Sequence, residues 1–499
     1  MSTIRRQSII SSITAYAGIG VGALNTLLAA RELDPALYGL YGGLFVAVAN
    51  IMYSVANFGM AYYIQRFYPY YHDHLPQKKN DMITWVLLMG TIGSLIVLGA
   101  GIIFKPFVIR KFGGHSASFV QYYYWIFPFG IGLTFYTLLE IYAWQLKRSV
   151  LTSFFREVLW RLITTVLVVL LLLHALRNIT VFIGIYSCSY LLLAITLSIY
   201  LIRKGELSFN WKASPVTRRF LPRIATMALA GWGSNMLFNL SFFFAQVVIA
   251  AVVPDGLTFV AVFSLGQFIA SLLQTPQKQI IAAATAPLSR AWKERDMGRI
   301  QRIYAQSSIN QLIFSVGLFL LIWLNFTDAA VSLHLRPEYL QAKTVFFFIG
   351  LTRIIDMGTG VNQQIIQTSK YYRYELITGI ILIAITLPLN YILAVKLGFI
   401  GPAIADLITF SIYNFIRWGF LARRFGLQPF TRHTLYTLLL GGAVYFICYL
   451  LFHRQQGFLW LVLRSISIIL LYAAGVLVLK LSSDIQPVWT TIRKRLRIN

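Results

Sequence analysis

The chain has few charged residues, and acidic residues are the scarcest of them. Only 12% of its 499 residues are charged, about half the usual share of a globular protein, and 16 acidic residues stand against 43 Lys and Arg. This scarcity excludes an ordinary soluble globule, and apolar runs of about 20 residues recur from end to end. These runs lack the short period-two alternation of barrel strands. With 58% hydrophobic residues, the sequence predicts an all-α polytopic membrane protein.

Cysteines and catalytic motifs are also sparse. The two cysteines, Cys188 and Cys448, both lie inside apolar runs, so neither a disulfide framework nor a metal cluster is predicted. The seven histidines show no HExxH spacing, and no glycine-rich phosphate loop or GxSxG elbow is present. We therefore expect no enzyme activity, no cofactor, no metal site and no ATP drive within this chain.

Fourteen apolar segments are long enough to cross a bilayer. An even number of spans places both termini on the same side of the membrane. We predict helices over residues 8–30, 38–60, 81–104, 117–143, 152–174, 178–202, 223–252, 257–283, 304–326, 341–368, 375–396, 400–422, 434–452 and 457–480.

The distribution of Lys and Arg sets the orientation of these spans. With a cytoplasmic N-terminus, basic residues in cytoplasmic segments outnumber those on the opposite side by about three to one, as the positive-inside rule requires. Most of the basic residues that give the net charge of +27 then face the cytosol and the anionic leaflet, so we do not expect nucleic-acid binding. Both termini are predicted to be cytoplasmic.

The sequence repeats itself at an offset of about 220 residues. LLAARELDPALYGLYGGLF matches VIAAVVPDGLTFVAVFSLG, WQLKRSV matches QTSKYYR, and VFIGIYSCSY matches GFIGPAIADL. Two parallel six-helix halves with a site at their interface are a recurring transporter plan. We predict two parallel six-helix lobes around a central cavity, followed by two extra helices. The predicted parts are an N-lobe (1–202), a basic cytoplasmic linker (203–222), a C-lobe (223–425), and helices 13 and 14 with a basic tail (426–499).

The segment 341–368 carries charge in the middle of an apolar run. Read as one continuous helix, it places Arg353, Asp356, Gly360, Gln363 and Gln367 on one face. A charged residue that faces lipid costs about 2.5 kcal/mol or more, so this face should meet a partner helix or a water-filled cavity. Two interpretations stay open: a substrate or ion site, or an Arg–Asp pair that only ties helices together.

Several other spans carry polar residues at helical spacing. Such residues either line a polar cavity between the lobes or form hydrogen bonds that pack helices together, and both interpretations stay open. The substrate-binding candidates among them are Asn25, Asn50, Asn57, Asn235, Asn239, Gln274 and Lys278.

Acidic residues inside spans are candidates for coupling transport to an ion gradient. Glu140 lies late in the fourth span and Asp356 in the tenth. Arg161, in the fifth span, is a candidate charge partner of Glu140 across neighbouring helices.

Five segments together carry a family resemblance: RRQSIISSITAYAGIGVG, LDPALYGLY, NFGM, LKRS and GFIGPAIADL. The chain resembles the polysaccharide-transporter, O-antigen flippase-like family of the multidrug/oligosaccharidyl-lipid/polysaccharide exporter superfamily. The resemblance implies a bacterial inner-membrane protein that moves an undecaprenyl-diphosphate-linked oligosaccharide to the periplasmic leaflet, for lipopolysaccharide or another surface polysaccharide. It implies alternating access coupled to an ion gradient, and partners among the glycan polymerases and glycosyltransferases of the pathway.

The sequence departs from this pattern in one respect. Lipid-linked precursor flippases of the superfamily place arginines in their first helices to hold the diphosphate, whereas this chain has none inside its first two predicted spans. The cations left for that role are Arg353, Lys278 and Arg161. Arginine suits phosphate oxygens through paired N–H donors. If Arg353 binds the diphosphate, Arg353→Ala abolishes transport and leaves expression intact.

Two other functions compete with the flippase. A multidrug cation antiporter of the same superfamily would favour a carboxylate-rich site in the N-terminal half, where Glu140 is the only acid well inside a predicted span. A membrane glycan polymerase or ligase would usually carry a large periplasmic loop, and the predicted external loops are short.

Overall fold

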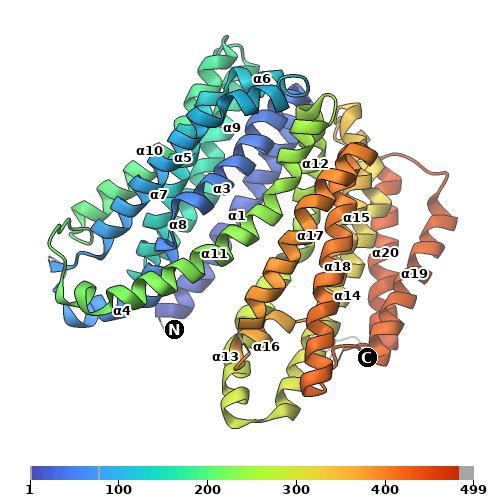
Figure 1. Cartoon of the computed structure of the whole chain (residues 1–499). Helices are drawn as coiled ribbons and strands as arrows, with labels where there is room; N and C mark the ends of the chain where they lie inside the picture. The colour runs from blue at the N-terminus through green and yellow to red at the C-terminus, as the bar shows by residue number, and fades with distance from the viewer. Residues whose placement is uncertain (1–2, 77–78, 372, 483–499) are drawn as a thin grey trace. The chain divides into compact units, whose positions relative to one another are not determined.

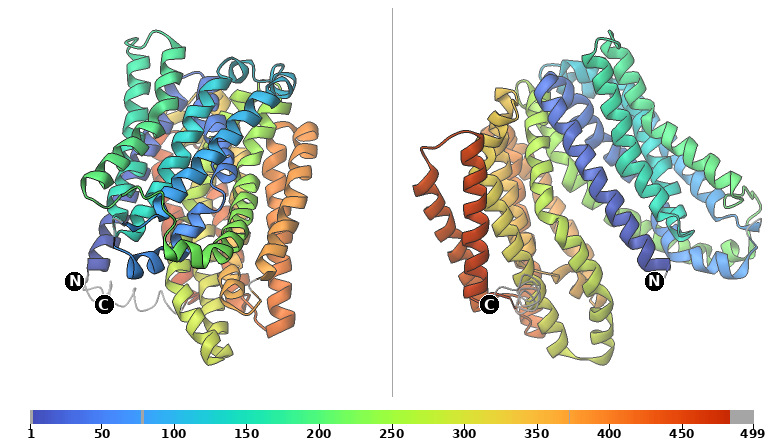
Figure 2. Two further views of the ribbon diagram at one scale, coloured as in Figure 1. Left: turned by 60° about the vertical axis from the view of Figure 1, so that its left-hand side comes forward. Right: turned by 180° about the vertical axis from the view of Figure 1, so that it is seen from behind.

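The computed structural model of the chain describes residues 3–76, 79–371 and 373–482. These residues are almost entirely helical, they contain no strand, and they form two compact units, residues 1–261 and 262–499. In each unit the long helices run side by side as a bundle (Figure 1, Figure 2). The predicted all-α fold is therefore confirmed. The predicted basic tail, residues 483–499, lies outside the described residues.

Unit 1 is built around α7, which packs against α3, α5 and α10. Gly132 of α7 allows a close approach, since a Cβ atom there would lie 2.4 Å from the backbone nitrogen of Leu191 in α10. The elements of unit 1 are α1 (Thr3–Glu32), α2 (Pro35–Tyr38), the π-helix η1 (Gly39–Leu44), α3 (Phe45–Ala56), α4 (Met60–His74), α5 (Met82–Phe112), α6 (Ala117–Gln121), η3 (Tyr123–Trp125), α7 (Ile126–Gln145), α8 (Ser149–Ser153), the π-helix η4 (Phe154–Leu159), α9 (Trp160–Leu172), α10 (Ile179–Arg203) and α11 (Pro215–Val252).

Unit 2 has α14 and α18 on either side of α15, with α17 packed on α18. Helix α12 (Gly256–Ser271) begins in unit 1 and ends in unit 2. The other elements of unit 2 are η5 (Leu272–Gln274), α13 (Thr275–Glu294), α14 (Met297–Ser332), η6 (Pro337–Gln341), α15 (Ala342–Gly358), α16 (Asn362–Thr368), α17 (Arg373–Leu397), η7 (Gly398–Ile400), α18 (Gly401–Phe425), α19 (Arg432–Phe452) and α20 (Phe458–Val478).

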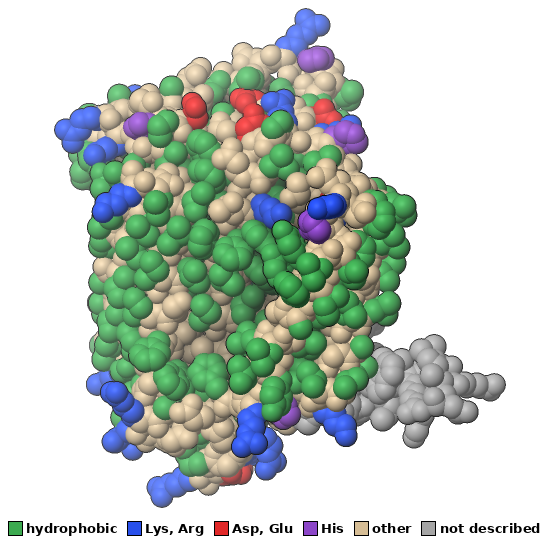
Figure 3. All heavy atoms as spheres, turned by 90° about the vertical axis from the view of Figure 1, so that its right-hand side faces the viewer, with side chains coloured by type: hydrophobic (Ala, Val, Ile, Leu, Met, Phe, Trp, Pro, Cys, Tyr) green, Lys and Arg blue, Asp and Glu red, His purple; other side chains and the backbone are tan. Residues whose placement is uncertain are grey.

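The number of membrane spans is compatible with the predicted fourteen but is not fixed by the structure. Ten helical stretches of the described residues are long and apolar enough to span, or eleven if a bent pair counts as one span. One of the ten, Arg373–Phe425, contains both α17 and α18. On the face that Figure 3 shows, charged side chains gather toward two opposite ends and hydrophobic side chains form the band between them, as expected for helices that cross a bilayer.

The segment predicted as a linker, residues 203–222, is helical from Pro215 onward. Ser214 caps α11 by accepting a hydrogen bond from the Thr217 backbone, and Pro215 occupies the first turn. Helix α11 packs against α3, α4 and α5, so the compact units divide at residue 261 and not at the linker. The two six-helix lobes and the sequence repeat stay predictions.

A buried carboxylate fixes this linker to unit 1. Asp81, fully buried at the start of α5, accepts hydrogen bonds through Oδ2 from the Ser214 backbone at 2.9 Å and from Thr217 Oγ1 at 2.6 Å. Tyr71 of α4 lies 2.6 Å from Thr217, and Tyr63 donates to Tyr71. Burial raises the pKa of Tyr71, so its phenol stays a neutral hydrogen-bonding group. The start of α11 is thereby held against α4 and α5.

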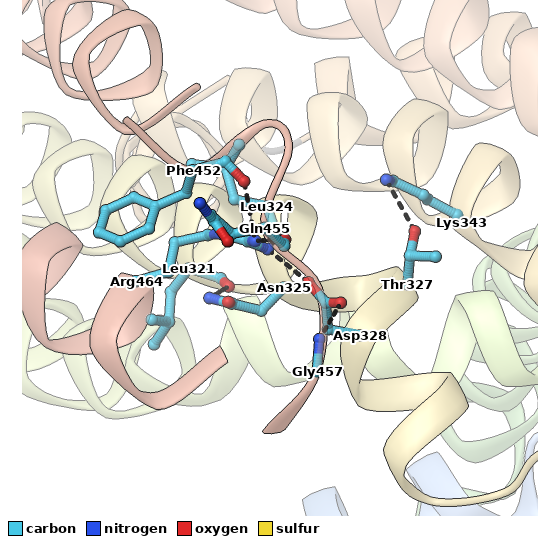
Figure 4. A network of polar contacts seen from close by, with 10 residues as sticks. All are labelled: Leu321, Leu324, Asn325, Thr327, Asp328, Lys343, Phe452, Gln455, Gly457 and Arg464. Atoms are coloured by element: carbon cyan, nitrogen blue, oxygen red, sulfur yellow. Dashed lines mark hydrogen bonds and ion pairs between the residues drawn. The ribbon is translucent and has the colours of Figure 1, made fainter. Parts of the chain in front are cut away.

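The C-terminal hairpin, α19 and α20, packs on α14. At its centre Arg464 of α20 contacts Asp328 of α14 at 2.7 Å, with side chains 7% and 10% exposed (Figure 4). Arg464 also donates to the carbonyl oxygens of Leu324, Phe452 and Gln455. A buried arginine with this many acceptors is satisfied within the protein. This pair anchors the turn between α19 and α20.

Candidate functional site

The charged span of unit 2 is a broken helix, so the prediction of one continuous helix over 341–368 is wrong. α15 ends at Gly358, α16 begins at Asn362, and the two axes differ by 47°. Gly360 lies between them with φ of +63°, a conformation that favours glycine. Two serines of α14 satisfy backbone groups freed at the break: Ser308 donates to the Gly358 carbonyl, and Ser307 accepts from the Val361 backbone at 3.3 Å.

A carboxylate with neutral hydrogen-bond donors lies just before this break. Asp356 accepts from the side-chain amide of Gln277 at 3.0 Å and from that of Asn414 at 3.2 Å. The Asn414 oxygen in turn accepts from Thr359 at 2.9 Å and from Asn362 at 3.0 Å. Residues of α13, α15, α16 and α18 therefore meet in one polar cluster, which we call the Asp356 cluster.

Arg353 lies one turn before Asp356 and is 7% exposed. It interacts electrostatically with both Asp356 and Asp406, and its guanidinium lies 5.9 Å from the centre of the Phe410 ring. Arg353 is thus a buried cation one turn from the Asp356 cluster, as expected for a charged residue of a membrane span that faces other helices.

The bend divides the predicted polar face into two clusters. Gln363 of α16 does not join the Asp356 cluster but donates to Glu375 of α17 at 2.9 Å. Glu375 also pairs with the buried Arg417 of α18, whose guanidinium lies 3.8 Å from the centre of the Tyr413 ring. Sequence spacing could not find this second cluster, because Glu375 and Arg417 lie near the ends of other predicted spans.

The remaining predicted residues of unit 2 lie near the start of α13. Gln274 ends η5, and Lys278 is exposed on α13, one residue after Gln277. Among the described residues, Lys278 has no ion-pair partner within 4 Å. It therefore stays an available cation on the exposed face of α13.

Unit 1 contains a cavity of about 130 Å³ that brings together two predicted residues, Asn57 and Asn235. Tyr53 of α3, Tyr62 and Gln65 of α4, and Gly231 of α11 are among the other residues that line it. Sequence reasoning did not select the tyrosines, because aromatic residues are common throughout the chain.

Asn57 sits at a second helix break, where the predicted helix over 38–60 ends early. α3 stops at Ala56, and the Asn57 amide donates to the Tyr53 carbonyl at 2.9 Å. Its side-chain oxygen accepts from the Gly59 backbone at 2.8 Å, and Gly59 has φ of +75°. The polar side chain therefore closes the end of α3 and also faces the cavity.

Three other predicted asparagines take part in local or packing contacts. Asn50 donates to the carbonyl of Val46 in its own helix at 2.7 Å. Asn239 donates to the backbone and side-chain oxygens of Asn235. Asn25 of α1 donates to two threonine hydroxyls of α9, at 3.2 and 3.0 Å. For Asn25 the contacts match the helix-packing interpretation.

The predicted pair of Glu140 and Arg161 is wrong. Glu140 of α7 is 3% exposed and contacts Arg156 of η4 at 2.7 Å. Arg161 instead contacts Glu157 at 2.8 Å and donates to the carbonyl of Gly18 in α1. Arg156 lies inside the π-helix η4 and Arg161 follows it in α9, so the wider turn of η4 changes the direction in which the two arginines face their neighbours. Glu140 is thus charge-compensated within unit 1.

The sequence of the chain matches a known protein family. The profile of the family described as "polysaccharide biosynthesis protein" matches residues 4–292, more than half of the chain. No curated protein matches the chain in sequence.

Solved structures share its fold. The lipid II flippase MurJ, in an inward closed conformation, superposes with a TM-score of 0.73 at 13% identity and covers 94% of this chain and 98% of that chain. An inward-facing multidrug resistance MATE transporter of the MOP superfamily gives 0.63 at 17% identity, with 81% and 94% coverage. A MOP-superfamily transporter from Pyrococcus furiosus gives 0.55 at 15% identity, with 84% and 95% coverage. At these identities the similarity concerns the fold.

Proposed function

Because the chain belongs to the polysaccharide biosynthesis protein family, we propose that it is a flippase for lipid-linked oligosaccharides in surface polysaccharide biosynthesis. In this proposal an undecaprenyl-diphosphate-linked glycan crosses the bacterial inner membrane by alternating access of two six-helix lobes around a central cavity. Both termini are cytoplasmic, and the product passes to a glycan polymerase.

The Asp356 cluster supports coupling of this transport to an ion gradient. Its carboxylate receives hydrogen bonds from the neutral amides of Gln277 and Asn414, at the end of a broken helix. Broken helices and ionisable residues inside the membrane mark ion and substrate pathways in transporters. A proton or a small cation arriving at Asp356 would change the charge balance with Arg353 and bias α16, whose position depends on the same cluster.

The burial of Arg353 changes the role we propose for it. Because Arg353 is only 7% exposed and lies one turn before Asp356, we propose it as a partner of that carboxylate and not as the first contact of the diphosphate. Lys278, exposed next to Gln277, is the cation that we propose for the diphosphate. A compact ammonium group binds phosphate as a point charge.

The test measures on which side of the membrane the undecaprenyl-linked glycan lies in cells depleted of the protein, with a periplasmic glycan-modifying enzyme as the reporter. We expect the precursor to accumulate out of the enzyme's reach and to become accessible again when the wild-type chain is restored. Asp356→Asn keeps the size of the side chain and removes its charge, and it should not restore access. Asp73→Asn, the same change on the exposed face of α4, should restore it.

Normal exposure of the precursor in depleted cells would exclude the flippase for that glycan. Multidrug cation export would then be the leading function, because MATE transporters share the fold. Its discriminating measurement is the drug susceptibility of a deletion strain. The ion pair between Glu140 and Arg156 weighs against export of cations through unit 1, since it leaves the buried Glu140 compensated.

A further inference from the structure

We propose that the cavity of unit 1 formed by α3, α4, α7 and α11 is a subsite for one uncharged sugar ring. This inference rests on the proposed function and specifies which part of the lipid-linked glycan unit 1 recognises. The diphosphate would bind elsewhere.

The chemistry of the lining favours a neutral, hydroxyl-rich ligand. None of the residues that line the cavity is charged, and three of them, Asn57, Gln65 and Asn235, carry side-chain amides. Tyr53 and Tyr62 add a phenol ring and a hydroxyl each. Amides donate and accept hydrogen bonds with hydroxyl groups, and aromatic rings offer flat apolar surfaces. A pyranose presents both kinds of surface, because its hydroxyls lie around the ring and its C–H groups lie on its faces.

Charged and purely apolar ligands fit the same lining poorly. A diphosphate would find no cation in the lining, and a cationic drug would find no carboxylate. An acyl or isoprenoid chain would cover the amides of Gln65 and Asn235 without offering them hydrogen bonds. A neutral sugar avoids both penalties.

The cavity is small and its back wall is rigid. A volume of about 130 Å³ is some ten times the space that one water molecule needs, so it suits a single ring and not a whole oligosaccharide. Asn57 is fixed by hydrogen bonds to Tyr53 and Gly59. A Cβ atom at Gly59 would lie 1.9 Å from the Ala228 carbonyl oxygen, so α11 packs directly on the helix break. Such preorganisation lowers the entropy cost of binding.

One wall, in contrast, is open to a ligand. Tyr62 is 48% exposed, and its ring lies on α11 at Gly231, where a Cβ atom would come within 2.5 Å of the ring carbon Cγ. A sugar in the cavity would cover the exposed part of this ring. Tyr62 therefore offers the stacking surface, and Asn235, on the next turn of α11, offers an amide to the ring hydroxyls.

The test uses saturation-transfer NMR on the purified full-length protein in detergent. The probes are methyl α-D-glucopyranoside, methyl β-D-galactopyranoside and methyl N-acetyl-β-D-glucosaminide, with glucuronate and inorganic pyrophosphate as charged comparisons. We expect transfer to at least one neutral glycoside. Tyr62→Ala and Asn235→Ala should each weaken its binding at least fivefold, whereas Tyr62→Phe should retain most of it. Tyr70→Ala is the matched control, since Tyr70 is a similarly exposed tyrosine of α4 that lies outside the cavity.

Three results would overturn the inference: no neutral glycoside binds the wild type, only the charged probes bind, or both alanine variants bind as the wild type does. Thermal melting of every variant shows whether a loss of binding reflects unfolding, and Tyr62→Phe and Asn235→Ala perturb the fold least. The sidedness assay is run in parallel. Restored glycan access by the wild type without glycoside binding rejects the subsite and keeps the flippase, whereas variant-sensitive binding with unchanged sidedness keeps the sugar site and rejects the flippase.

Discussion

Replacing Arg464 by methionine should open the C-terminal hairpin of α19 and α20. Its guanidinium holds Asp328 of α14 and three backbone carbonyls around the turn between the two helices (Figure 4). Methionine keeps much of the side-chain length and removes every hydrogen-bond donor. Asp328 would remain buried, with one hydrogen bond from the Gly457 backbone at 3.1 Å.

The size of the effect follows from this uncompensated carboxylate. Removing one partner of a buried ion pair costs about 3–5 kcal/mol. Because each 1.4 kcal/mol is a factor of ten, the population of the open hairpin should rise roughly a hundredfold to a few thousandfold. The double variant Asp328→Asn/Arg464→Met should recover part of the loss, since it removes the buried charge. Its cost should be smaller than the sum of the two single costs.

The two cysteines provide the assay. Cys448 of α19 is fully buried and Cys188 of α10 is exposed. In a Cys188→Ser background, a thiol-reactive dye therefore labels Cys448 only when the hairpin opens, and the labelling rate reports the open population when closing is fast. Rates are divided by those of the same variant in denaturant, which removes differences in intrinsic thiol reactivity. A change of less than about threefold in Arg464→Met would refute the assignment of the pair as the anchor of the hairpin.

Two further predictions concern the helix break and the linker. Gly360→Ala should lower the melting temperature by an amount equivalent to about 1–3 kcal/mol, because alanine there is strained at φ of +63° and its Cβ would meet a serine of α14. Gly379→Ala, where the space is open, should melt like the wild type. Asp81→Ala should release the start of α11 by removing the acceptor for Thr217, so trypsin should cleave at Lys212 faster than in the wild type. An unchanged cleavage rate would show that the linker is held by other contacts.

The sequence predicted the fold class and the family because both depend on features summed over the whole chain. The apolar runs, the asymmetry of Lys and Arg between loops and the set of short motifs change little when the ends of one helix are predicted wrongly. It also selected Asp356, since a carboxylate in an apolar run is expensive wherever it lies. It did not select Gln277 or Asn414, the residues that hold this carboxylate, because they come from α13 and α18 and only helix packing brings them to α15.

The ion pairs also show that sequence periodicity does not determine which charged residues meet. The positions of Glu140 and Arg161 in neighbouring predicted spans make Arg161 a candidate partner, but in the structure Arg156 forms the ion pair with Glu140. A π-helix at Phe154–Leu159 widens the helix locally and rotates the residues beyond it. Nothing in the local composition marks this rotation, so the choice between two arginines five residues apart could not be made from periodicity.

The two helix breaks show why the sequence identifies polar residues inside the spans but not the groups to which those residues bind. In Asn57–Phe58–Gly59 and in Gly358–Thr359–Gly360, glycine takes a positive φ next to a polar side chain. A break inside a membrane frees backbone groups that must be satisfied by protein. Asn57 satisfies them within its own segment, whereas the break after α15 relies on two serines of α14.

A helix break therefore divides a polar stripe, although a glycine near a polar side chain does not mark a break by itself: Gly93–Ser94 of α5 and Gly266–Gln267 of α12 lie in continuous helices. Helical periodicity cannot be continued across a break, which is why Gln363 fell outside the Asp356 cluster. The polar groups at a break are already committed to the backbone. The proposed sugar and diphosphate contacts rest instead on Tyr62 and Asn235, which line the cavity of unit 1, and on Lys278, which is exposed on α13 of unit 2.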